Sequence, residues 1–279
     1  MPKIAIITLG PEGAWETYVR QKLKVALELG IEAVFIPLDD ADEKTLLKKI
    51  DEINHDSTFH GMIVQRPMPG SINKQTVTNA IAPEKDVDGF RSDSEFEVPV
   101  WLAVKRLLEE SFSQLSVLCG RLSDSSSPIS KPKNKKQIDW DRKTENREPI
   151  TGLKFAVLGK GETAGGPAIR ALKKLGAQLA VIDSKTQNTT EIIKSADVII
   201  TSVGKNGIIN SRNIKPGAIL IGVGTHVADG KLRGDYDESD IKEVAGAYTP
   251  TPGGVGPVNL SYLFENLIHA AEIQNQNTP

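Results

Sequence analysis

Short continuous apolar runs alternate with longer amphipathic segments in the N-terminal part of the chain, and this alternation leaves few folds open to it. The runs lie at residues 4–9, 33–38 and 62–64, and the segments between them at 12–29 and 42–55. A run that is apolar on both faces is typical of a buried parallel strand, and a segment with an apolar stripe is typical of a helix. The order strand–helix–strand–helix–strand predicts a parallel sheet with right-handed crossovers.

The same alternation returns in the C-terminal half. Strands are predicted at 155–158, 179–182, 198–201 and 219–223, with a helix at 164–175 after the first of them. We therefore expect two doubly wound α/β domains with a cleft between them, the C-terminal one a Rossmann-type dinucleotide-binding domain. A length of 279 residues is ample for two domains.

Changes in composition predict the domain boundaries. The first domain is expected at 1–110, ending in a linking helix over 97–110, and the second at 150–257. A last apolar helix within 258–275 is expected to pack back on the first domain and complete it. Residues 111–149 are rich in Ser, Lys and Asn, which predicts a polar, flexible insert whose basic run is a solvated charge run rather than a phosphate site.

Composition argues against several classes of protein. The net charge of −2 gives no basic excess, so we expect no nucleic-acid partner. Cys119 is the only cysteine, so an internal disulfide or a cysteine metal site is not expected, as in a reducing cytoplasm. The apolar start of the chain is too short for a signal peptide, and no stretch approaches the roughly 20 apolar residues of a membrane span. These features predict a cytoplasmic protein without a membrane or metal partner.

A glycine-rich turn follows the first strand of the second domain. Gly159, Lys160 and Gly161 form the turn, and Gly165 begins the next helix. Glycines there permit close approach of the backbone to a pyrophosphate, and the helix N-terminus supplies N–H groups and a positive dipole. The spacing G-x-G-x-x-x-G departs from the usual pattern, which leaves a plain tight turn as the alternative, but the placement between strand and helix favours a dinucleotide site.

Asp183 ends the next strand, where an acid accepts a hydrogen bond from a ribose 2′-hydroxyl and favours NAD over NADP. Lys160 and Lys185 favour NADP instead, because either could bind a 2′-phosphate. A turn cap is a simpler role for Asp183. The choice between NAD and NADP therefore stays open. The predicted cofactor-binding residues are Gly159, Lys160, Gly161, Glu162, Thr163, Gly165, Asp183, Ser184, Lys185, Val203 and Gly204.

Candidate catalytic residues lie in the first domain. Tyr18 and Lys22 are four residues apart and share one face of the predicted first helix. A lysine desolvated near a phenol can act as an acid or base near neutral pH, whereas a surface contact is the simpler interpretation of the pair. Gln65 and Asp88 follow apolar segments, so we expect them at the carboxyl edge of the sheet. The amide of Gln65 offers a hydrogen-bond donor and an acceptor, and Asp88 offers a charged acceptor, which suits a ligand with an amino-pyrimidinone ring. Turn chemistry alone is the alternative for both.

A run of nine residues at 249–257 holds three glycines and three prolines. These residues fix an unusual backbone path. The run is interpreted either as a rigid loop that brings main chain close to a ligand or as a structural turn between domains.

These motifs together resemble the bifunctional methylenetetrahydrofolate dehydrogenase/methenyltetrahydrofolate cyclohydrolase family, over about residues 1–95 and 150–272. The matching segments are Tyr18–Lys22 with the family's Tyr-x-x-x-Lys, Val64–Pro69 with Val-Gln-Leu-Pro-Leu-Pro, Pro83–Phe90 with Pro-x-Lys-Asp-Val-Asp-Gly, and Thr249–Pro257 with Thr-Pro-x-Pro-Gly-Gly-Val-Gly-Pro. The last two are highly specific.

The resemblance implies an enzyme that oxidises 5,10-methylenetetrahydrofolate with NAD or NADP and then hydrolyses the methenyl product to 10-formyltetrahydrofolate. The folate would lie in the cleft, facing the nicotinamide. Lys22 would be the key catalytic group, Tyr18 would help position it, Gln65 would hold and tune it, and Asp88 would bind the pterin ring. The resemblance also implies substrate contacts from Pro252, Gly253 and Gly254, tetrahydrofolate one-carbon derivatives as ligands, and a homodimer.

The chain departs from the family pattern at several of these places. The family's Gly-Arg-Ser is Gly159-Lys160-Gly161 in this chain, and its His-Ser-Arg is Asp183-Ser184-Lys185. Each site has thus lost an arginine, which can bind a phosphate with two hydrogen bonds, whereas lysine acts only as a point charge. Trp15 stands where the family has a serine, and Gly222 where it has an aspartate. Two alternatives remain: a catalytically silent folate- or nucleotide-binding homologue, and a dehydrogenase of another small substrate on the same fold.

Overall fold

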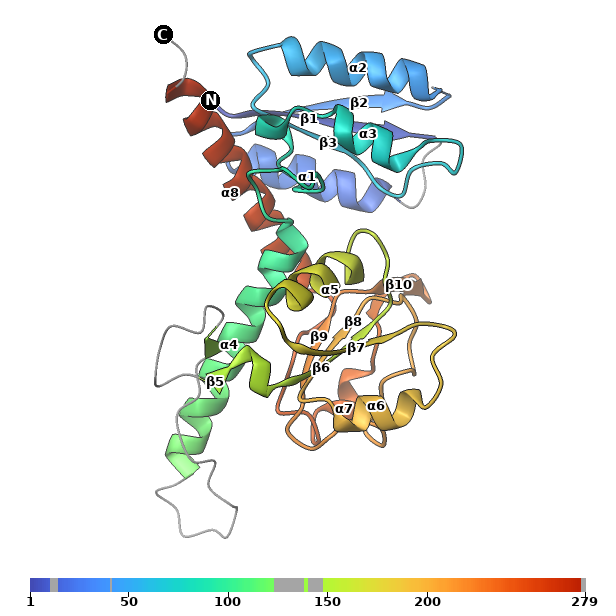
Figure 1. Cartoon of the computed structure of the whole chain (residues 1–279), viewed down its shortest axis with the longest axis vertical. Helices are drawn as coiled ribbons and strands as arrows, with labels where there is room; N and C mark the ends of the chain where they lie inside the picture. Colours follow the sequence, from blue (N-terminus) through green and yellow to red (C-terminus); the bar gives the residue numbers. More distant parts are fainter. Residues whose placement is uncertain (11–14, 41, 123–137, 140–147, 277–279) are drawn as a thin grey trace. The chain divides into compact units, whose positions relative to one another are not determined.

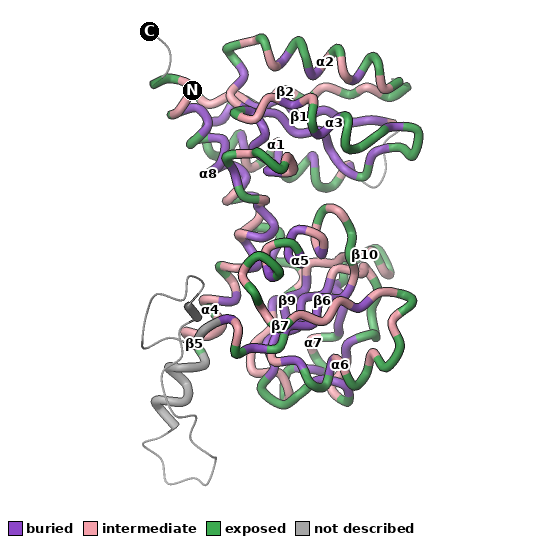
Figure 2. Tube along the Cα trace, in the orientation of Figure 1, coloured by how far each residue is buried: buried purple, intermediate pink, exposed green. Residues whose placement is uncertain are grey.

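The computed structural model divides into two compact units, Met1–Pro99 with Asn259–Pro279 and Val100–Val258. The structure describes residues 1–10, 15–40, 42–122, 138–139 and 148–276. Each unit has its own sheet and helices (Figure 1). In each of them the buried residues gather on the central strands (Figure 2). Within the described residues, no helix is long and apolar enough to cross a membrane.

The N-terminal unit contains a three-stranded parallel sheet in the order β2-β1-β3. Its strands are β1 (Lys3–Leu9), β2 (Glu32–Leu38) and β3 (Gly61–Val64). Ile7 of β1 lies opposite Ile36 of β2 and Val64 of β3. The predicted strands and their parallel pairing are confirmed.

Helices cover both faces of this sheet. They are α1 (Glu16–Glu28), α2 (Glu43–His55), α3 (Lys74–Ala80) and α8 (Val255–Gln276). Ala5 and Ile7 join a core cluster with α2 and α3, whereas Ile4 joins a cluster with α1 and α8 on the other face (Figure 1). Phe264 and Leu267 of α8 are fully buried there. Each such side chain stabilises the fold by about 1.5–3 kcal/mol, so α8 is an integral part of this unit.

Lys85 closes the C-terminal end of α2 from a short 3₁₀ helix, η1 (Pro83–Lys85). Its Nζ donates to the carbonyl oxygens of Ile53 at 2.7 Å, Asn54 at 2.9 Å and Asp56 at 2.8 Å. The last carbonyls of a helix lack partners within the helix and carry its partial negative charge, so a cation is well suited to this place. Lys85 is only 4% exposed, and this burial lowers its pKa. Its place in the family motif is therefore structural.

The second unit contains a five-stranded parallel sheet in the order β12-β9-β8-β6-β7. The strands are β6 (Lys154–Leu158), β7 (Gln178–Ile182), β8 (Val198–Thr201), β9 (Ile219–Gly222) and β12 (Ala247–Tyr248). Its other elements are α5 (Gly165–Lys174), α6 (Thr189–Ser195), α7 (Glu238–Ile241) and the antiparallel pair β10 (Thr225–Ala228) and β11 (Lys231–Gly234). The chain adds β7 on one side of β6 and β8 on the other, so the order reverses between β6 and β8. Open α/β sheets bind ligands at the carboxyl ends of strands at such a reversal.

The linking helix is longer than the sequence analysis predicts. Instead of ending at residue 110, α4 runs over Pro99–Leu122. The predicted helix end at 110 is too early because apolar residues continue at helical spacing through Phe112, Leu115 and Leu118, and the polar composition begins only after the helix. Within the remainder of the predicted insert, β4 (Ile138–Asp139) pairs with β5 (Glu148–Pro149), which leads into η2 (Ile150–Gly152). Residues 123–137 and 140–147 of the insert lie outside the described residues.

Replacing Lys85 with methionine should lower the free energy of unfolding by about 2–4 kcal/mol. The three hydrogen bonds to its charged group, each worth about 1.5–3 kcal/mol, are lost, but the cost of burying that charge is removed as well and offsets part of the loss. Urea unfolding of the full chain measures this. Lys44→Met, on the exposed face of α2, is the matched control and should change stability by less than about 0.5 kcal/mol. A Lys85→Met protein as stable as the parent would show that these three bonds do not hold α2 in place.

Candidate active site

Lys22 is buried, with only 8% of its surface exposed. On α1 it shares the buried stripe with Val19 and Ala26. Its Nζ donates to Oε1 of Gln65 at 2.6 Å, a bond that joins α1 to the end of β3. The interpretation of Lys22 as a surface contact is therefore wrong.

Gln65 is fixed on both sides of its amide group. Its main-chain N–H donates to the carbonyl oxygen of Ile7 at 2.8 Å, which continues the pairing of β3 with β1. Its side-chain Nε2 donates to the carbonyl oxygen of Arg66 at 2.8 Å. The next peptide bond, Arg66–Pro67, is cis. Oε1 of Gln65 is thus aimed at Lys22.

Burial lowers the pKa of Lys22 below its usual value, because the charged ammonium loses the solvation that water provides. The carboxylate of Asp88 acts in the opposite direction and raises this pKa. Gln65 supplies an oxygen that accepts a hydrogen bond without supplying a negative charge. The arrangement is that of a lysine that can lose its proton more easily than a lysine in water.

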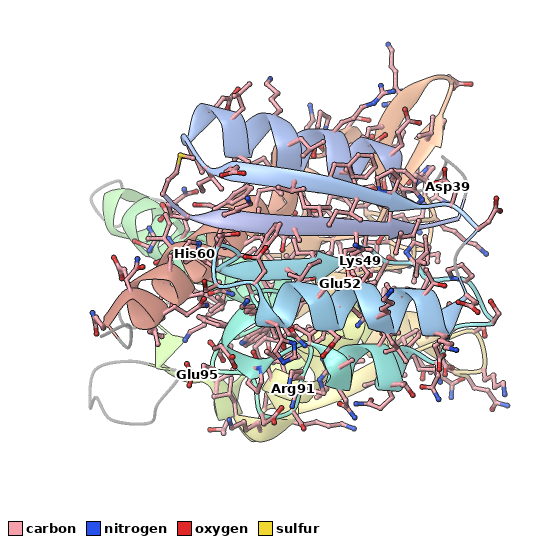
Figure 3. All side chains as sticks on the ribbon, turned by 90° about the horizontal axis from the view of Figure 1, so that it is seen from above. Asp39, Lys49, Glu52, His60, Arg91 and Glu95 are labelled. Carbon is pink, nitrogen blue, oxygen red and sulfur yellow. The ribbon has the colours of Figure 1, made fainter. Side chains whose placement is uncertain are left out.

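Asp88 lies in a tight turn after η1 and is partly buried. The next residue, Gly89, has φ +67°, and a Cβ on it would lie 2.7 Å from the carbonyl oxygen of Phe96, so the turn requires glycine. Asp86, one residue before Val87, is 1% exposed and accepts a hydrogen bond from the main chain of Arg91 at 2.9 Å. Burial, assisted by the charge of Asp88, raises the pKa of Asp86 to about 6. Arg91, which donates the hydrogen bond to Asp86, is labelled in Figure 3.

Arg66 connects the turn that holds Asp88 with the segment that follows β3. Its guanidinium carbon lies 4.2 Å from the centre of the Phe90 ring, and its Nη2 donates to Oγ1 of Thr78 at 2.9 Å. Arg66 is 8% exposed. A guanidinium over an aromatic face is attracted by the ring's negative charge density. This contact holds the segments of Gln65 and Asp88 together, and the sequence analysis did not foresee it.

Tyr18 lies one turn of α1 before Lys22, and 50% of its surface is exposed. Trp15, at the start of the same helix, packs with Ile6 and Val19, and its ring centre lies 6.0 Å from that of Phe35. Trp15 therefore belongs to the packing of α1 on the sheet.

The glycine-rich turn of the second unit lies where the strand order reverses. Gly159 has φ +86°, and a Cβ on it would lie 2.8 Å from the carbonyl oxygen of Ser202, the residue that follows β8. A Cβ on Gly165 would overlap the carbonyl oxygen of Gly159, so α5 can begin this close to the turn only with glycine. A Cβ on Gly161 would meet no atom within 4 Å, which shows open space beside this backbone. The turn and the helix start therefore fit a pyrophosphate group.

Asp183 forms an ion pair with Lys160, with 2.7 Å between Oδ2 and Nζ. Its Oδ1 accepts hydrogen bonds from the main chain of Lys185 at 2.9 Å and from Oγ1 of Thr186 at 3.1 Å. These bonds, that of Lys160 foremost, lower the pKa of Asp183 to about 2. Asp183 thus caps a turn, as the alternative interpretation held, and also pairs with the glycine-rich turn.

The remaining predicted cofactor residues lie at the same edge of the sheet or beside it. Glu162 is partly buried and Thr163 exposed before α5, and Ser184 is exposed after Asp183. Val203 and Gly204 follow β8.

Asp235 holds the loop after β8 and was missed by the sequence analysis. It is fully buried, and its two carboxylate oxygens accept the main-chain N–H groups of Val203 and Lys205, both at 3.0 Å. Gly204 between them has φ +64°. A Cβ on Gly224 would overlap Oδ2 of Asp235, so this packing also needs a glycine. Asp235 follows an antiparallel hairpin rather than a parallel strand, and no strand-end pattern pointed to it.

Tyr236 and Thr249 fix the start of the glycine- and proline-rich loop. The hydroxyl of Tyr236 donates to the carbonyl oxygen of Thr249 at 2.7 Å, and Oγ1 of Thr249 accepts the main-chain N–H of Gly222 at 2.8 Å. Burial raises the pKa of Tyr236 to about 12, so its hydroxyl stays a donor. A Cβ on Gly222 would lie 3.1 Å from this hydroxyl, so Tyr236 occupies the space that a larger residue at 222 would need.

The loop itself contains the three residues expected to contact substrate. The Thr251–Pro252 peptide bond is cis, and Gly253 has φ +105°. A Cβ on Gly254 would lie 2.5 Å from the carbonyl oxygen of Pro250. This path is fixed by its glycines and by the hydrogen bond from the main chain of Thr251 to Glu238 at 2.8 Å. Pro252, Gly253 and Gly254 belong to the second unit, whereas Lys22, Gln65 and Asp88 belong to the first.

Across the described residues, no group of three or more His, Cys, Asp or Glu side chains could hold a metal ion.

Comparison with known proteins gives consistent matches over both units. Residues 1–88 match the model "Tetrahydrofolate dehydrogenase/cyclohydrolase, catalytic domain", and residues 143–275 match its "NAD(P)-binding domain". The bifunctional protein FolD of Macrococcus caseolyticus is 33% identical over 276 residues, which cover 99% of this chain and 89% of that protein.

Two solved structures agree with this. The bifunctional FolD methylenetetrahydrofolate dehydrogenase/cyclohydrolase of Campylobacter jejuni matches with a TM-score of 0.78 and 27% identity, covering 98% of this chain and 88% of the other. The dehydrogenase-cyclohydrolase of Trypanosoma brucei, solved with NADP and an inhibitor, matches with a TM-score of 0.73 and 26% identity, covering 99% and 88%. The resemblance seen in the motifs is thereby confirmed, and the chain belongs to the tetrahydrofolate dehydrogenase/cyclohydrolase family.

Proposed function

We propose that this protein oxidises 5,10-methylenetetrahydrofolate to methenyltetrahydrofolate with a nicotinamide dinucleotide, and then hydrolyses the product to 10-formyltetrahydrofolate. The observation that carries the proposal is the buried Lys22, bonded to Gln65 and within the electrostatic reach of Asp88. This group lies in the segment that matches the family's catalytic domain. The bifunctional relatives from Macrococcus caseolyticus and Campylobacter jejuni support both activities.

The second unit supplies the cofactor site in this proposal. When bound, a nicotinamide ring supplies an acceptor for hydride from the methylene carbon of the folate. The proposed contacts to the pyrophosphate of the dinucleotide come from the turn at Gly159–Gly161 and from the start of α5 at Gly165. The glycines there allow the backbone to approach the pyrophosphate closely. Val203 and Gly204, fixed by Asp235, would line the same edge.

Lys22 acts on the folate in two ways. Since burial favours its neutral form, Lys22 adds little positive charge beside the folate as the methenyl cation forms. In the hydrolysis, its amine takes a proton from the water that attacks the methenyl carbon and returns it to N5 of the folate as the bond between that carbon and N5 breaks. The hydroxyl proton of the intermediate leaves to solvent as the formyl C=O forms. Gln65 keeps Nζ aimed at the reacting carbon through the bond of 2.6 Å.

The other first-unit residues bind and position the substrate. Asp88 presents a carboxylate that can accept two N–H groups from the amino-pyrimidinone edge of the pterin. Tyr18, half exposed and one helical turn from Lys22, positions the substrate beside it. Pro252, Gly253 and Gly254 are proposed as further substrate contacts. Assembly as a homodimer is proposed from the family resemblance alone, and a cytoplasmic location from the sequence features described above.

The direct test supplies methylenetetrahydrofolate together with NAD or NADP and follows the absorbance of the reduced cofactor. Turnover with at least one of the two is expected. A folded protein that reduces neither would contradict the dehydrogenase activity, and folate binding without turnover would identify a catalytically silent homologue.

Lys22→Met should slow the hydrolysis of methenyltetrahydrofolate by about 10²–10⁴-fold, the usual contribution of a general acid–base group. The loss of the methenyl absorbance measures the rate. Lys24→Met is the matched control, since Lys24 lies on the exposed face of the same helix and pairs only with Glu28, at 3.8 Å, among the ion pairs described. The role of Lys22 is refuted when the Lys22→Met variant and the parent protein, both folded by circular dichroism, hydrolyse at the same rate.

The pH dependence of hydrolysis should report the pKa of Lys22. The reaction needs the neutral amine, so kcat rises as pH increases through that pKa. Because the carboxylate of Asp88 raises the pKa of Lys22, Asp88→Asn should move this rising limb to lower pH, besides weakening substrate binding. Glu95→Gln removes an exposed charge from a nearby segment (Figure 3) and should leave the limb in place. A limb that stays fixed or moves to higher pH in Asp88→Asn would argue against this coupling.

A further inference from the structure

We infer that the ion pair between Lys160 and Asp183 makes this protein select NAD over NADP, and that the charge of Asp183 is the element that decides the selection. The inference rests on the proposed function, since it assigns the cofactor of that same site. The sequence alone left this choice open, because it placed an acid and two lysines at one edge of the sheet. The geometry of the ion pair distinguishes the role of Asp183 from that of Lys160.

The pair lies where a doubly wound fold receives the adenosine ribose. Leu158, the last residue of β6, is opposite Ile182, the last residue of β7. The main chain of Gly159 then donates to the carbonyl oxygen of Ile182 at 2.9 Å, which keeps the two strand ends together. Lys160 and Asp183 follow directly at the carboxyl edge. The end of the second strand is the position from which an acid reaches the ribose 2′-hydroxyl.

Hydrogen-bond counting shows what the carboxylate of Asp183 can still accept. A carboxylate offers about four acceptor positions, two on each oxygen. Oδ1 accepts from the main chain of Lys185 at 2.9 Å and from Thr186 at 3.1 Å, and Oδ2 accepts from Lys160 at 2.7 Å. About one position on Oδ2 remains, which suits the single donor of a 2′-hydroxyl. The two bonds to Oδ1 keep the carboxylate at the tip of β7, so it cannot turn away from a ligand there without breaking them.

A 2′-phosphate meets the opposite situation. It brings between one and two negative charges and no hydrogen atom that it readily donates at neutral pH. The carboxylate of Asp183 is ionised throughout the range of ordinary assays, because its pKa is about 2. Lys160, the cation nearest to this carboxylate, already uses one of its three donors on it. A phosphate placed at this edge would therefore lie against a fixed negative charge.

Removing the charge of Asp183 should reverse the selection. An asparagine keeps the size of the side chain and an oxygen that can accept the bonds from Lys185 and Thr186. It no longer repels a phosphate, and Lys160, whose side chain is 68% exposed, becomes available to bind one. The gain of affinity for NADP in this variant should then depend on Lys160.

The experiment measures the binding of NAD and of NADP by calorimetry without folate, and kcat/KM for both with methylenetetrahydrofolate. The parent protein should favour NAD at least about tenfold in both measurements, a difference of about 1.4 kcal/mol. Asp183→Asn should raise the affinity for NADP at least about tenfold and lower that for NAD by less than about tenfold. In Asp183→Asn combined with Lys160→Met the gain for NADP should be lost.

Glu191→Gln is the matched control, because it removes an exposed negative charge from α6 of the same unit. Its ratio of NAD to NADP affinities should equal that of the parent protein. A parent protein that binds NADP more tightly, or an unchanged ratio in Asp183→Asn, overturns the inference. Selective binding of NAD with no turnover would leave this inference standing and refute the proposed function, so the two failures are distinguishable.

Discussion

The hydrogen bond between Lys22 and Gln65 sets the requirements that the rest of the N-terminal unit meets. An ammonium group loses favourable solvation when it is buried, and a neutral acceptor compensates for only part of that loss. The bond forms because α1 presents Lys22 on its buried stripe and because β3 ends where Gln65 pairs with β1. The bond from Gln65 to the carbonyl oxygen of Arg66 completes the orientation of the amide. A lysine held in this way has a fixed position and gives up its proton more easily than a lysine in water.

The same unit buries two further cations, Lys85 and Arg66. Lys85 donates to three carbonyl oxygens at the end of α2, and Arg66 donates to the hydroxyl of Thr78 while lying over the ring of Phe90. Both therefore stabilise backbone segments on either side of the site. The family motif that contains Lys85 and Asp88 therefore combines a structural residue with one that we propose binds the substrate.

Much of the fold and part of the site could be predicted from the sequence. Apolar runs specify parallel strands well, because a strand buried on both faces has no alternative to an apolar composition. The predicted end of the linking helix was wrong because its last turns are apolar at helical spacing but carry serine, glycine and polar residues that resemble a loop. Asp235 and Arg66 were not predicted as site residues, since their importance arises from contacts between segments distant in the sequence. Spacing alone could not distinguish a buried Lys22 from a surface one.

The departures from the family pattern are best understood in pairs. Gly222 lacks the side chain that would meet the hydroxyl of Tyr236, and Tyr236 in turn fixes Thr249 before the loop of Pro252 and Gly253. Lys160 and Asp183 depart together and are bonded to each other. Gly222 thus leaves the space that Tyr236 occupies, and Lys160 and Asp183 each supply the charged partner of the other. A chain that was losing its function would have no need for the matched pair Lys160 and Asp183, whereas a chain whose cofactor preference had shifted would need such a pair at this edge of the sheet.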